Sequence, residues 1–397
     1  MTLSDRSDDA PVQFEEWRCV DNSVLGVATL NLPNALNALN LTMVNLLLAK
    51  LTEWQQRDDI GAVLLQASGD KAFCAGGDVV SLHRAMQAHP GAVPEVAREF
   101  FGQEYQLDHA IHAFAKPFIV WGSGIVMGGG MGLLMGASHR IVTDTSRLAM
   151  PEITIGLFPD VGGSYFLNQM PPGCGLFCGL TGAMINASDA LELGLADYFM
   201  GSDQGSQLQA QLKNTAWHAP DAVQQLNDYL TDTQQQVSAQ MPASLFARHL
   251  AAIEPLRDST SAEHAVAYIL SLPADSDQWL SDQWLSRAQG NLRSGSPITM
   301  HLVFEQLQRA KGLSLAEVLR MEYTMALNCA RAGEFQEGVR ALLIDKDRQP
   351  NWLFAEVSAV PADFIVGFFE PQWQGEHPLC MLTDIAPEAG AKQESKQ

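Results

Sequence analysis

The stretch GIVMGGGMG, residues 124–132, decides how the chain around it folds. An apolar run typical of a buried strand leads into Gly128–Gly130, and a second apolar run follows, so these glycines predict a strand-to-helix turn. Backbone N–H groups at a helix N-terminus have no partner within the helix, and the helix dipole favours negative charge there. Because glycine has no side chain, a substrate carbonyl can approach this main chain closely.

A second glycine loop, FCAGGD at residues 73–78, lies upstream of this turn. Two backbone donors aimed at one carbonyl oxygen form an oxyanion hole, which stabilises the charge that develops on that oxygen during acyl transfer. We therefore expect the two glycine turns to supply one N–H group each.

A membrane-spanning helix is one alternative for the glycine run. Residues 118–138 contain no Asp, Glu, Lys or Arg, and four glycines spaced four apart are typical of a small-residue helix face: Gly124, Gly128, Gly132 and Gly136. However, each of the seven glycines in this span would weaken a helix by about 1 kcal/mol. The alternating strands and helices on both sides also favour a sheet.

A dinucleotide site is the other alternative. Gly122, Gly124 and Gly128 follow a predicted strand, and Asp144 stands close to where a ribose-binding acid would fall. Such a fingerprint usually opens its domain, whereas here a long region of alternating structure precedes it. The oxyanion interpretation is therefore favoured.

Two carboxylates follow the glycine run, in MPEITIGLFPDVGG at residues 150–163. Glu152 and Asp160 stand in an apolar, glycine-rich context, where a charged group is costly to bury unless it is paired. Structural roles are the alternatives: Glu152 would cap the segment after Pro151, and Asp160 would be a turn residue before Gly162. Their place beside the glycine turn favours catalytic roles.

Composition limits the class of protein. The 397 residues suggest two or three domains, and the net charge of −21 argues against nucleic-acid binding. The six cysteines show no disulfide or zinc spacing, so we expect a reducing compartment and no metal. Because residues 1–13 have no apolar segment of a signal peptide and are acidic, we expect a cytoplasmic protein without a membrane partner.

The order of predicted elements indicates an α/β fold. Strands alternate with helices up to about residue 185, which implies parallel pairing, and helices dominate afterwards. We divide the chain into a core with the site at 12–202, a variable helical region at 203–290, a C-terminal helical region at 291–370 and a polar, flexible tail at 371–397.

Three motifs in this order, KAFCAGGDV, GIVMGGGMG and MPEITIGLFPDVGG, resemble the crotonase (enoyl-CoA hydratase/isomerase) superfamily, and NLPNALNALN at 31–40 extends the resemblance. The resemblance implies a spiral of ββα units that binds an acyl-CoA, with the oxyanion-hole amides on Gly77 and Gly129. It implies no cofactor, since CoA is part of the substrate. Family members usually form trimers or larger homo-oligomers, but the added C-terminal helices leave a monomer or dimer open.

The sequence departs from the hydratases of this superfamily. The resemblance implies that hydratases use two catalytic glutamates, one just after the glycine run and one in the PE motif. The first of these positions is Gly132 here, the second is Glu152, and FPDVGG adds Asp160. This pattern is similar to the 3-hydroxyisobutyryl-CoA hydrolase branch, as are FFGQEYQLDHAI at 100–111 and residues 321–352. That resemblance implies thioester hydrolysis in valine catabolism, with Glu104, Gly129, Glu152 and Asp160 contacting substrate. The alternative for Glu104 is an exposed helix surface.

The resemblance also implies CoA contacts from the backbone near Ala38 and Ala72 and from a C-terminal basic residue, Lys346 or Arg340. These two basic side chains are equally well explained as surface charges. In the implied chemistry Glu152 attacks the thioester directly or activates water. Asp160 binds the substrate hydroxyl, positions water or protonates the thiolate. A hydratase that uses Glu152 with Asp160, or a non-catalytic CoA-binding protein, remains the alternative.

Overall fold

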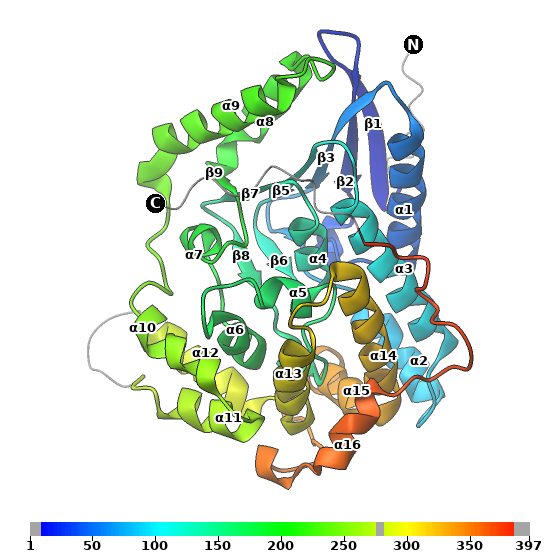
Figure 1. Ribbon diagram of the computed structural model, residues 1–397, viewed down its shortest axis with the longest axis vertical. Helices are drawn as coiled ribbons and strands as arrows, with labels where there is room; N and C mark the ends of the chain where they lie inside the picture. Colours follow the sequence, from blue (N-terminus) through cyan, green and yellow to red (C-terminus); the bar gives the residue numbers. More distant parts are fainter. Residues whose placement is uncertain (1–8, 275–281, 385–397) are drawn as a thin grey trace.

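The computed structural model describes residues 9–274 and 282–384, and it confirms the predicted α/β class (Figure 1). The strands are β1 (Val12–Arg18), β2 (Val24–Leu30), β3 (Ile60–Ala67), β4 (Ala72–Cys74), β5 (Phe118–Gly122), β6 (Ile125–Met127), β7 (His139–Thr143), β8 (Arg147–Ala149) and β9 (Tyr198–Met200). The helices in the first two thirds are α1 (Leu41–Gln56), α2 (Val79–Ala88), α3 (Glu95–His112), α4 (Gly129–Met135), α5 (Gly163–Leu167), α6 (Cys174–Thr181), α7 (Ala187–Glu192), α8 (Gly205–Asn214), α9 (Ala222–Val237) and α10 (Leu250–Ile253). The later helices are α11 (Ala262–Ser271), α12 (Asp282–Ser294), α13 (Pro297–Arg309), α14 (Leu315–Ala332), α15 (Glu334–Val339) and α16 (Ala362–Val366).

Two sheets are built by one repeated unit. The large sheet has the order β1-β2-β3-β5-β7-β9, and every pair is parallel except the β1–β2 hairpin. The small parallel sheet has the order β4-β6-β8. A long strand, a short strand and a helical segment recur as β3-β4-α2, β5-β6-α4 and β7-β8-η2, where η2 is the 3-10 helix Glu152–Ile155. This recurrence is the expected spiral of ββα units.

Helices cover the two faces of the large sheet differently. Leucines of α8 and α9 pack on one face, against side chains such as Leu25, Leu64 and Ile141. The other face belongs to a larger core, to which α1, α3 and α4 contribute and which continues into the C-terminal helices. Figure 1 shows α8 and α9 on one side of the strands and α1 with α3 on the other. The glycine turns and Glu152 belong to the second side.

The C-terminal helices pack against the spiral instead of standing apart from it. Helix α14 contacts α3 and α5, and α13 contacts α5 and α6. Buried residues from β1 to Leu382 share one apolar core. The division of the chain at residues 202, 290 and 370 stays a prediction.

The prediction of a polar, flexible tail from residue 371 onward is wrong for the first part of that segment. Leu379 and Leu382 are buried in the main core, and the ring of Trp373 packs against that of Tyr323 on α14. Isolated apolar residues in a polar segment gave no periodic pattern from which this docking could be predicted. Residues 385–397 lie outside the described part of the chain.

The membrane alternative for residues 118–138 is wrong, because this span forms β5, β6 and α4 with tight turns between them. Across residues 9–274 and 282–384, the structure holds no helix with the length and apolar character needed to cross a bilayer. The acid of the dinucleotide alternative, Asp144, accepts hydrogen bonds from the backbone and hydroxyl of Ser202.

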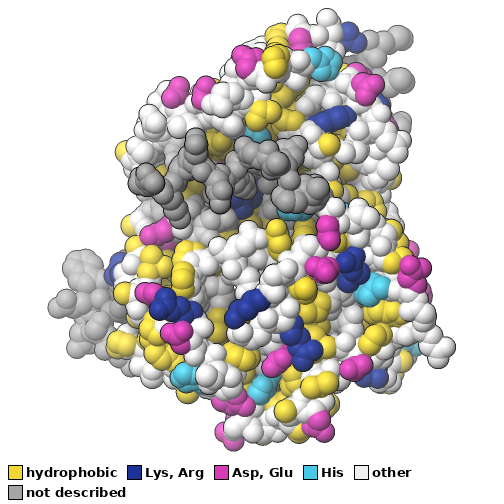
Figure 2. Space-filling view, viewed as in Figure 1, with side chains coloured by type: hydrophobic (Ala, Val, Ile, Leu, Met, Phe, Trp, Pro, Cys, Tyr) yellow, Lys and Arg dark blue, Asp and Glu magenta, His cyan; other side chains and the backbone are white. Residues whose placement is uncertain are grey.

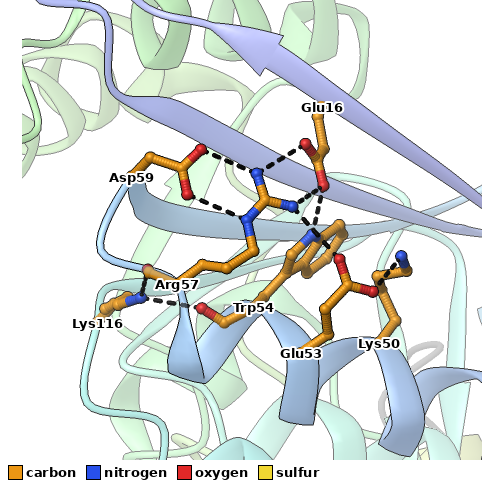
Figure 3. Close-up of polar contacts among 7 residues, drawn as sticks. All are labelled: Glu16, Lys50, Glu53, Trp54, Arg57, Asp59 and Lys116. Carbon is orange, nitrogen blue, oxygen red and sulfur yellow. Dashed lines mark hydrogen bonds and ion pairs between the residues drawn. The ribbon is translucent and has the colours of Figure 1, made fainter. Parts of the chain in front are cut away.

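Polar contacts fasten the C-terminal end of α1 to the β1 edge of the large sheet (Figure 3). Arg57 forms ion pairs with Glu16 on β1 and with Asp59. The ammonium group of Lys116 donates to the carbonyl oxygens of Trp54 and Arg57 at the C-terminal end of the helix. The Trp54 indole is fully buried and donates to Glu16.

Trp54 is the apolar anchor of this corner. A Cβ atom at Gly26 of β2 would lie 2.9 Å from the indole, so the ring packs directly on the strand backbone. We expect Trp54→Ala to lower the free energy of unfolding by about 3–5 kcal/mol, since it empties a large buried volume. Denaturant titration followed by circular dichroism measures this. Glu53→Ala, a change at the exposed end of the same network, should stay within about 0.5 kcal/mol of wild type, and an equal loss in both variants would contradict the assignment.

Candidate active site

The two predicted glycine turns meet. Gly77 follows β4, and Gly129 is the first residue of α4, separated from β6 by Gly128. A Cβ atom at Gly129 would lie 3.5 Å from the Gly77 nitrogen. Within the described residues, neither amide N–H donates a hydrogen bond, as expected for the first residue of a helix and for a loop residue. Two free amides this close together are what the predicted oxyanion hole requires.

Glu104 approaches these amides from α3. Its side chain is 2 % exposed, and its Oε1 would lie 2.5 Å from a Cβ atom at Gly129. Any side chain at position 129 would collide with this carboxyl group, so the close approach requires glycine here. The exposed-surface alternative for Glu104 is wrong.

Glu152 lies against the same turn. It is the first residue of η2, and its Oε1 would lie 3.1 Å from a Cβ atom at Gly128. Its Oε2 is buried and has no hydrogen-bond partner among the described residues. No side-chain hydrogen bond caps η2, so capping does not explain why this carboxyl group is buried.

Asp160 joins the site through α3. Tyr105, the neighbour of Glu104, donates its hydroxyl hydrogen to Asp160 Oδ2 at 2.8 Å. Both side chains are buried. The turn alternative holds for the backbone, since the Asp160 carbonyl accepts from Gly163 N, but the side chain faces the other carboxyl groups.

The electrostatics of the site are those of acids buried without a cation. Burial, followed by the neighbouring acids, raises the pKa of Glu104 and Glu152 well above the ordinary value. Burial raises the pKa of Asp160 to about 6, although the Tyr105 hydrogen bond opposes the shift. No Lys, Arg or His of the described chain lowers any of these three pKa values. Asp160 is therefore the acid that ionises most readily near neutral pH.

The segment that carries Asp160 is held by the C-terminal helices. Glu322 on α14 accepts hydrogen bonds from Gly162 N at 2.7 Å and Ser164 N at 2.8 Å. The side chain of Gln306 on α13 donates to the Pro159 carbonyl at 2.8 Å. This clamp holds Val161 at φ 53°, a backbone conformation that a β-branched residue rarely adopts.

Sequence reasoning missed three residues of this site: Tyr105, Asp108 and Glu322. Tyr105 and Asp108 lie within the FFGQEYQLDHAI segment, and the i, i+4 spacing of Glu104 and Asp108 was a signal that they share a helix face. Glu322 had no such signal, since its partners lie far away in the sequence. In residues 9–274 and 282–384 no group of three or more His, Cys, Asp or Glu side chains is arranged to hold a metal ion.

The predicted CoA-contacting segments are adjacent. Asn37, which precedes Ala38, donates to the carbonyl of Ala72 at 2.9 Å, and Leu39 N donates to Gly76 O. Lys346 is exposed. Arg340 is engaged by Glu337, Asp345 and Asp347, so its charge is already matched. On the face seen in Figure 2, Lys and Arg side chains lie among acidic ones.

Comparison with known proteins shows the family of this chain. The family model described as enoyl-CoA hydratase/isomerase matches residues 25–369. The chain belongs to this family. Among solved structures, an enoyl-CoA hydratase from Rhodobacter sphaeroides matches with TM-score 0.77 and 31% identity, over 91% of this chain and 98% of the other. A carnitinyl-CoA dehydratase from Mycobacterium thermoresistibile matches with TM-score 0.76 and 30% identity, over 91% and 97%.

Curated members of the family are similar over most of their length. The 3-hydroxyisobutyryl-CoA hydrolase of Xenopus tropicalis is 36% identical over 87% of this chain and 86% of its own. The enzyme of Danio rerio is 36% identical over 86% and 85%, and the human enzyme is 32% identical over 87% and 86%.

These relatives overturn the expected cytoplasmic location, since all three are named as mitochondrial enzymes. The inference failed for a physical reason. Unpaired cysteines indicate a reducing compartment, but they do not distinguish one reducing compartment from another.

Glu322 makes stability depend on pH. Burial raises its pKa from 4.5 to about 8, so the folded protein holds this proton more tightly than the unfolded chain does. The stabilisation is complete below the ordinary pKa and is lost as pH rises through about 8. Between pH 5 and 8, we expect the melting temperature to fall less steeply in Glu322→Gln than in wild type. The difference over this range corresponds to about 2–4 kcal/mol in the free energy of unfolding.

Glu263→Gln is the matched control. The pKa of Glu263 lies below its ordinary value, so this carboxyl group does not change its charge between pH 5 and 8. Thermal melts of the three proteins at matched ionic strength measure the slopes. Equal slopes in wild type and Glu322→Gln would contradict the assignment.

Proposed function

We propose that this protein hydrolyses the thioester of a short 3-hydroxyacyl-CoA of the 3-hydroxyisobutyryl-CoA type, releasing the hydroxy acid and CoA. The supporting observation is that Gly77 and Gly129 present two unpaired amides, and that the unpartnered carboxyl group of Glu152 lies against the neighbouring Gly128. The names of the curated relatives support the same substrate. A role in valine catabolism belongs to this proposal, since it rests on that acyl group. No cofactor takes part in it, since CoA enters as part of the substrate.

The reaction begins at the polarised carbonyl. Its oxygen accepts hydrogen bonds from the amides of Gly77 and Gly129, which stabilise the tetrahedral oxyanion. Glu152 either attacks the carbonyl carbon, forming an anhydride that water cleaves, or removes a proton from the attacking water. In both routes Glu152 acts as a carboxylate. Its buried, unpartnered Oε2 makes that carboxylate a strong base once it has lost its proton.

Asp160 and Glu104 complete the proposed roles. Asp160, with a pKa of about 6, exchanges a proton near neutral pH and passes it to the departing thiolate. Tyr105 orients Asp160 for this transfer. Glu104, with a pKa well above 4.5, remains neutral beside Gly129 and donates a hydrogen bond to the bound acyl group.

A hydratase is the second candidate, favoured by the solved structures titled enoyl-CoA hydratase and carnitinyl-CoA dehydratase. In that reaction Glu152 and Asp160 would add water to an enoyl-CoA without breaking the C–S bond. A CoA-binding protein without turnover would release no thiol. Trapping of free thiol from 3-hydroxyisobutyryl-CoA and from crotonyl-CoA separates all three.

We expect thiol release from the hydroxyacyl thioester, and we expect Glu152→Ala to abolish it. Glu152→Gln, which keeps the size of the side chain but has no carboxylate, should also lose at least about 10² in kcat. Asp160→Ala should retain reduced activity. Wild-type thiol release by Glu152→Gln would refute the mechanism.

Gly129→Ala tests the oxyanion hole separately. Its methyl group would lie 2.5 Å from Glu104 Oε1 and 3.3 Å from Leu39 Cδ1, so the turn or its neighbours must shift. Loss of one oxyanion donor typically costs about 10²–10³ in rate. We expect a loss of that size in kcat, with a melting temperature close to wild type as the control for folding. Unchanged kcat in a folded variant would exclude Gly129 as a donor.

The rate should depend on pH. Because Glu152 acts as a carboxylate and its pKa lies well above 4.5, kcat/KM should be low at pH 5 and rise as Glu152 loses its proton. It should fall again at higher pH, as Asp160 loses the proton that it gives to the thiolate. Loss of thioester absorbance measures this without a pH-sensitive reagent. A flat profile from pH 5 to 8 would contradict the proposal.

A further inference from the structure

The proposed mechanism leaves one buried acid of the site unused. Asp108 lies one helical turn after Glu104 on α3 and is 3 % exposed. Neither carboxyl oxygen has a hydrogen-bond partner among the described residues. Buried polar atoms are nearly always paired in native proteins, so two unpaired oxygens on one side chain point to a ligand or water.

Gly132 provides the space that Asp108 occupies. A Cβ atom at Gly132 would lie 2.6 Å from Asp108 Oδ1 and 2.8 Å from the Val161 Cβ atom. Any larger residue at position 132 would displace the carboxyl group or the Asp160 segment. The Asp108 side chain thus reaches from α3 to the face of α4 at Gly132.

This position matches the reach of a short acyl chain. Gly132 follows Gly129 by three residues, so it lies on the same face of α4, about 4.5 Å farther along the helix axis. If the thioester oxygen binds at the Gly129 amide and the acyl chain runs along α4, the acyl carbon two bonds beyond the carbonyl carbon extends toward Gly132. A hydroxyl group on that carbon comes within reach of Asp108.

The surroundings of Asp108 suit a hydroxyl group. The groups that face it are Glu104 on α3, Asp160 in the loop before α5, Glu322 on α14 and the Cys74 thiol on β4. The first three are carboxylic acids, and burial together with them raises the pKa of Asp108 well above the ordinary value. A neutral carboxyl group offers one O–H donor and one carbonyl acceptor, and a hydroxyl group offers both in return. An anionic substituent would be repelled.

We propose that Asp108 binds the 3-hydroxyl group of the acyl chain and makes the site selective for hydroxylated thioesters. This inference rests on the proposed hydrolysis and adds to it the residue that recognises the substrate. A pocket with polar groups paired to a substrate hydroxyl rejects the analogue that lacks it, because the buried groups are then left unpaired.

The test compares 3-hydroxyisobutyryl-CoA with isobutyryl-CoA in wild type and in Asp108→Leu. Leucine has nearly the shape of a neutral aspartic acid, so the variant should melt at or above the wild-type temperature. We expect kcat/KM for the hydroxylated thioester to fall about tenfold to a hundredfold. The kcat/KM for isobutyryl-CoA should stay unchanged or rise. The preference of the enzyme for the hydroxylated thioester should therefore be lost.

Asp108→Asn retains a donor and an acceptor and should keep most of the preference. Asp108→Ala is a second apolar variant and should lose it. Glu334→Gln is the matched control, because Glu334 is also buried but is paired with Ser296 and the Leu353 amide, outside the site. A parallel fall for both thioesters in the Leu and Ala variants, with the ratio unchanged, would overturn the inference.

Hydrolysis of neither thioester by wild type would refute the proposed function instead. Calorimetric Kd values for the two thioesters then decide the role of Asp108. Tighter binding of the hydroxylated thioester by wild type, lost in Asp108→Leu, supports the inference. The same ratio of the two Kd values in wild type and in Asp108→Leu overturns the inference.

Discussion

The site depends on carboxyl groups that are buried together without a cation. Glu104, Asp108 and Glu152 lie against the residues Gly128–Gly132, and Asp160 lies near enough to raise their pKa values. No base of the described chain compensates them, so they cannot all be ionised at neutral pH. The protein therefore keeps protons where the substrate binds. An acyl thioester needs this, because its cleavage requires a base for water and an acid for the thiolate.

The C-terminal helices are part of this arrangement. Asp160 follows two apolar residues and precedes Val161 in a left-handed conformation, so the local sequence alone does not fix its position. Glu322 and Gln306 bind the main chain on both sides of it. Helix α3 contributes Glu104, Tyr105 and Asp108 to the site, and it packs directly on α14. The helical region after the spiral thus holds the acids in place.

The sequence predicts those features that depend on local pattern. The glycine turns at residues 77 and 129 were predictable because only glycine permits the close approach seen there. Glu152 and Asp160 were predictable because acids in an apolar run need a reason to be buried. Short β4 was not predicted, since three residues inside a glycine-containing loop leave no periodic signal.

Contacts between distant segments account for the remaining misses. The pairing of Glu322 with Gly162 spans 160 residues, and no pattern within α14 separates this acid from one that faces solvent. The sequence leaves the charge of Arg340 open to a CoA phosphate or to a surface role, and the fold pairs it with three acids. Burial of Leu379 likewise depends on a surface formed by other helices.

Gly132 links the architecture to the choice of reaction. A carboxylate on α4 at this position would project from the same helix that provides the oxyanion donor, as the resemblance to hydratases implies. Here α4 carries no side chain at that point, and an acid enters from α3 instead. The acid on α3 is surrounded by other acids, which holds it neutral, and a neutral carboxyl group is a poor base but a good hydrogen-bond partner. Moving the acid from one helix to another thus replaces a group suited to proton removal with one suited to recognition, and leaves the role of base to Glu152, which lies against Gly128.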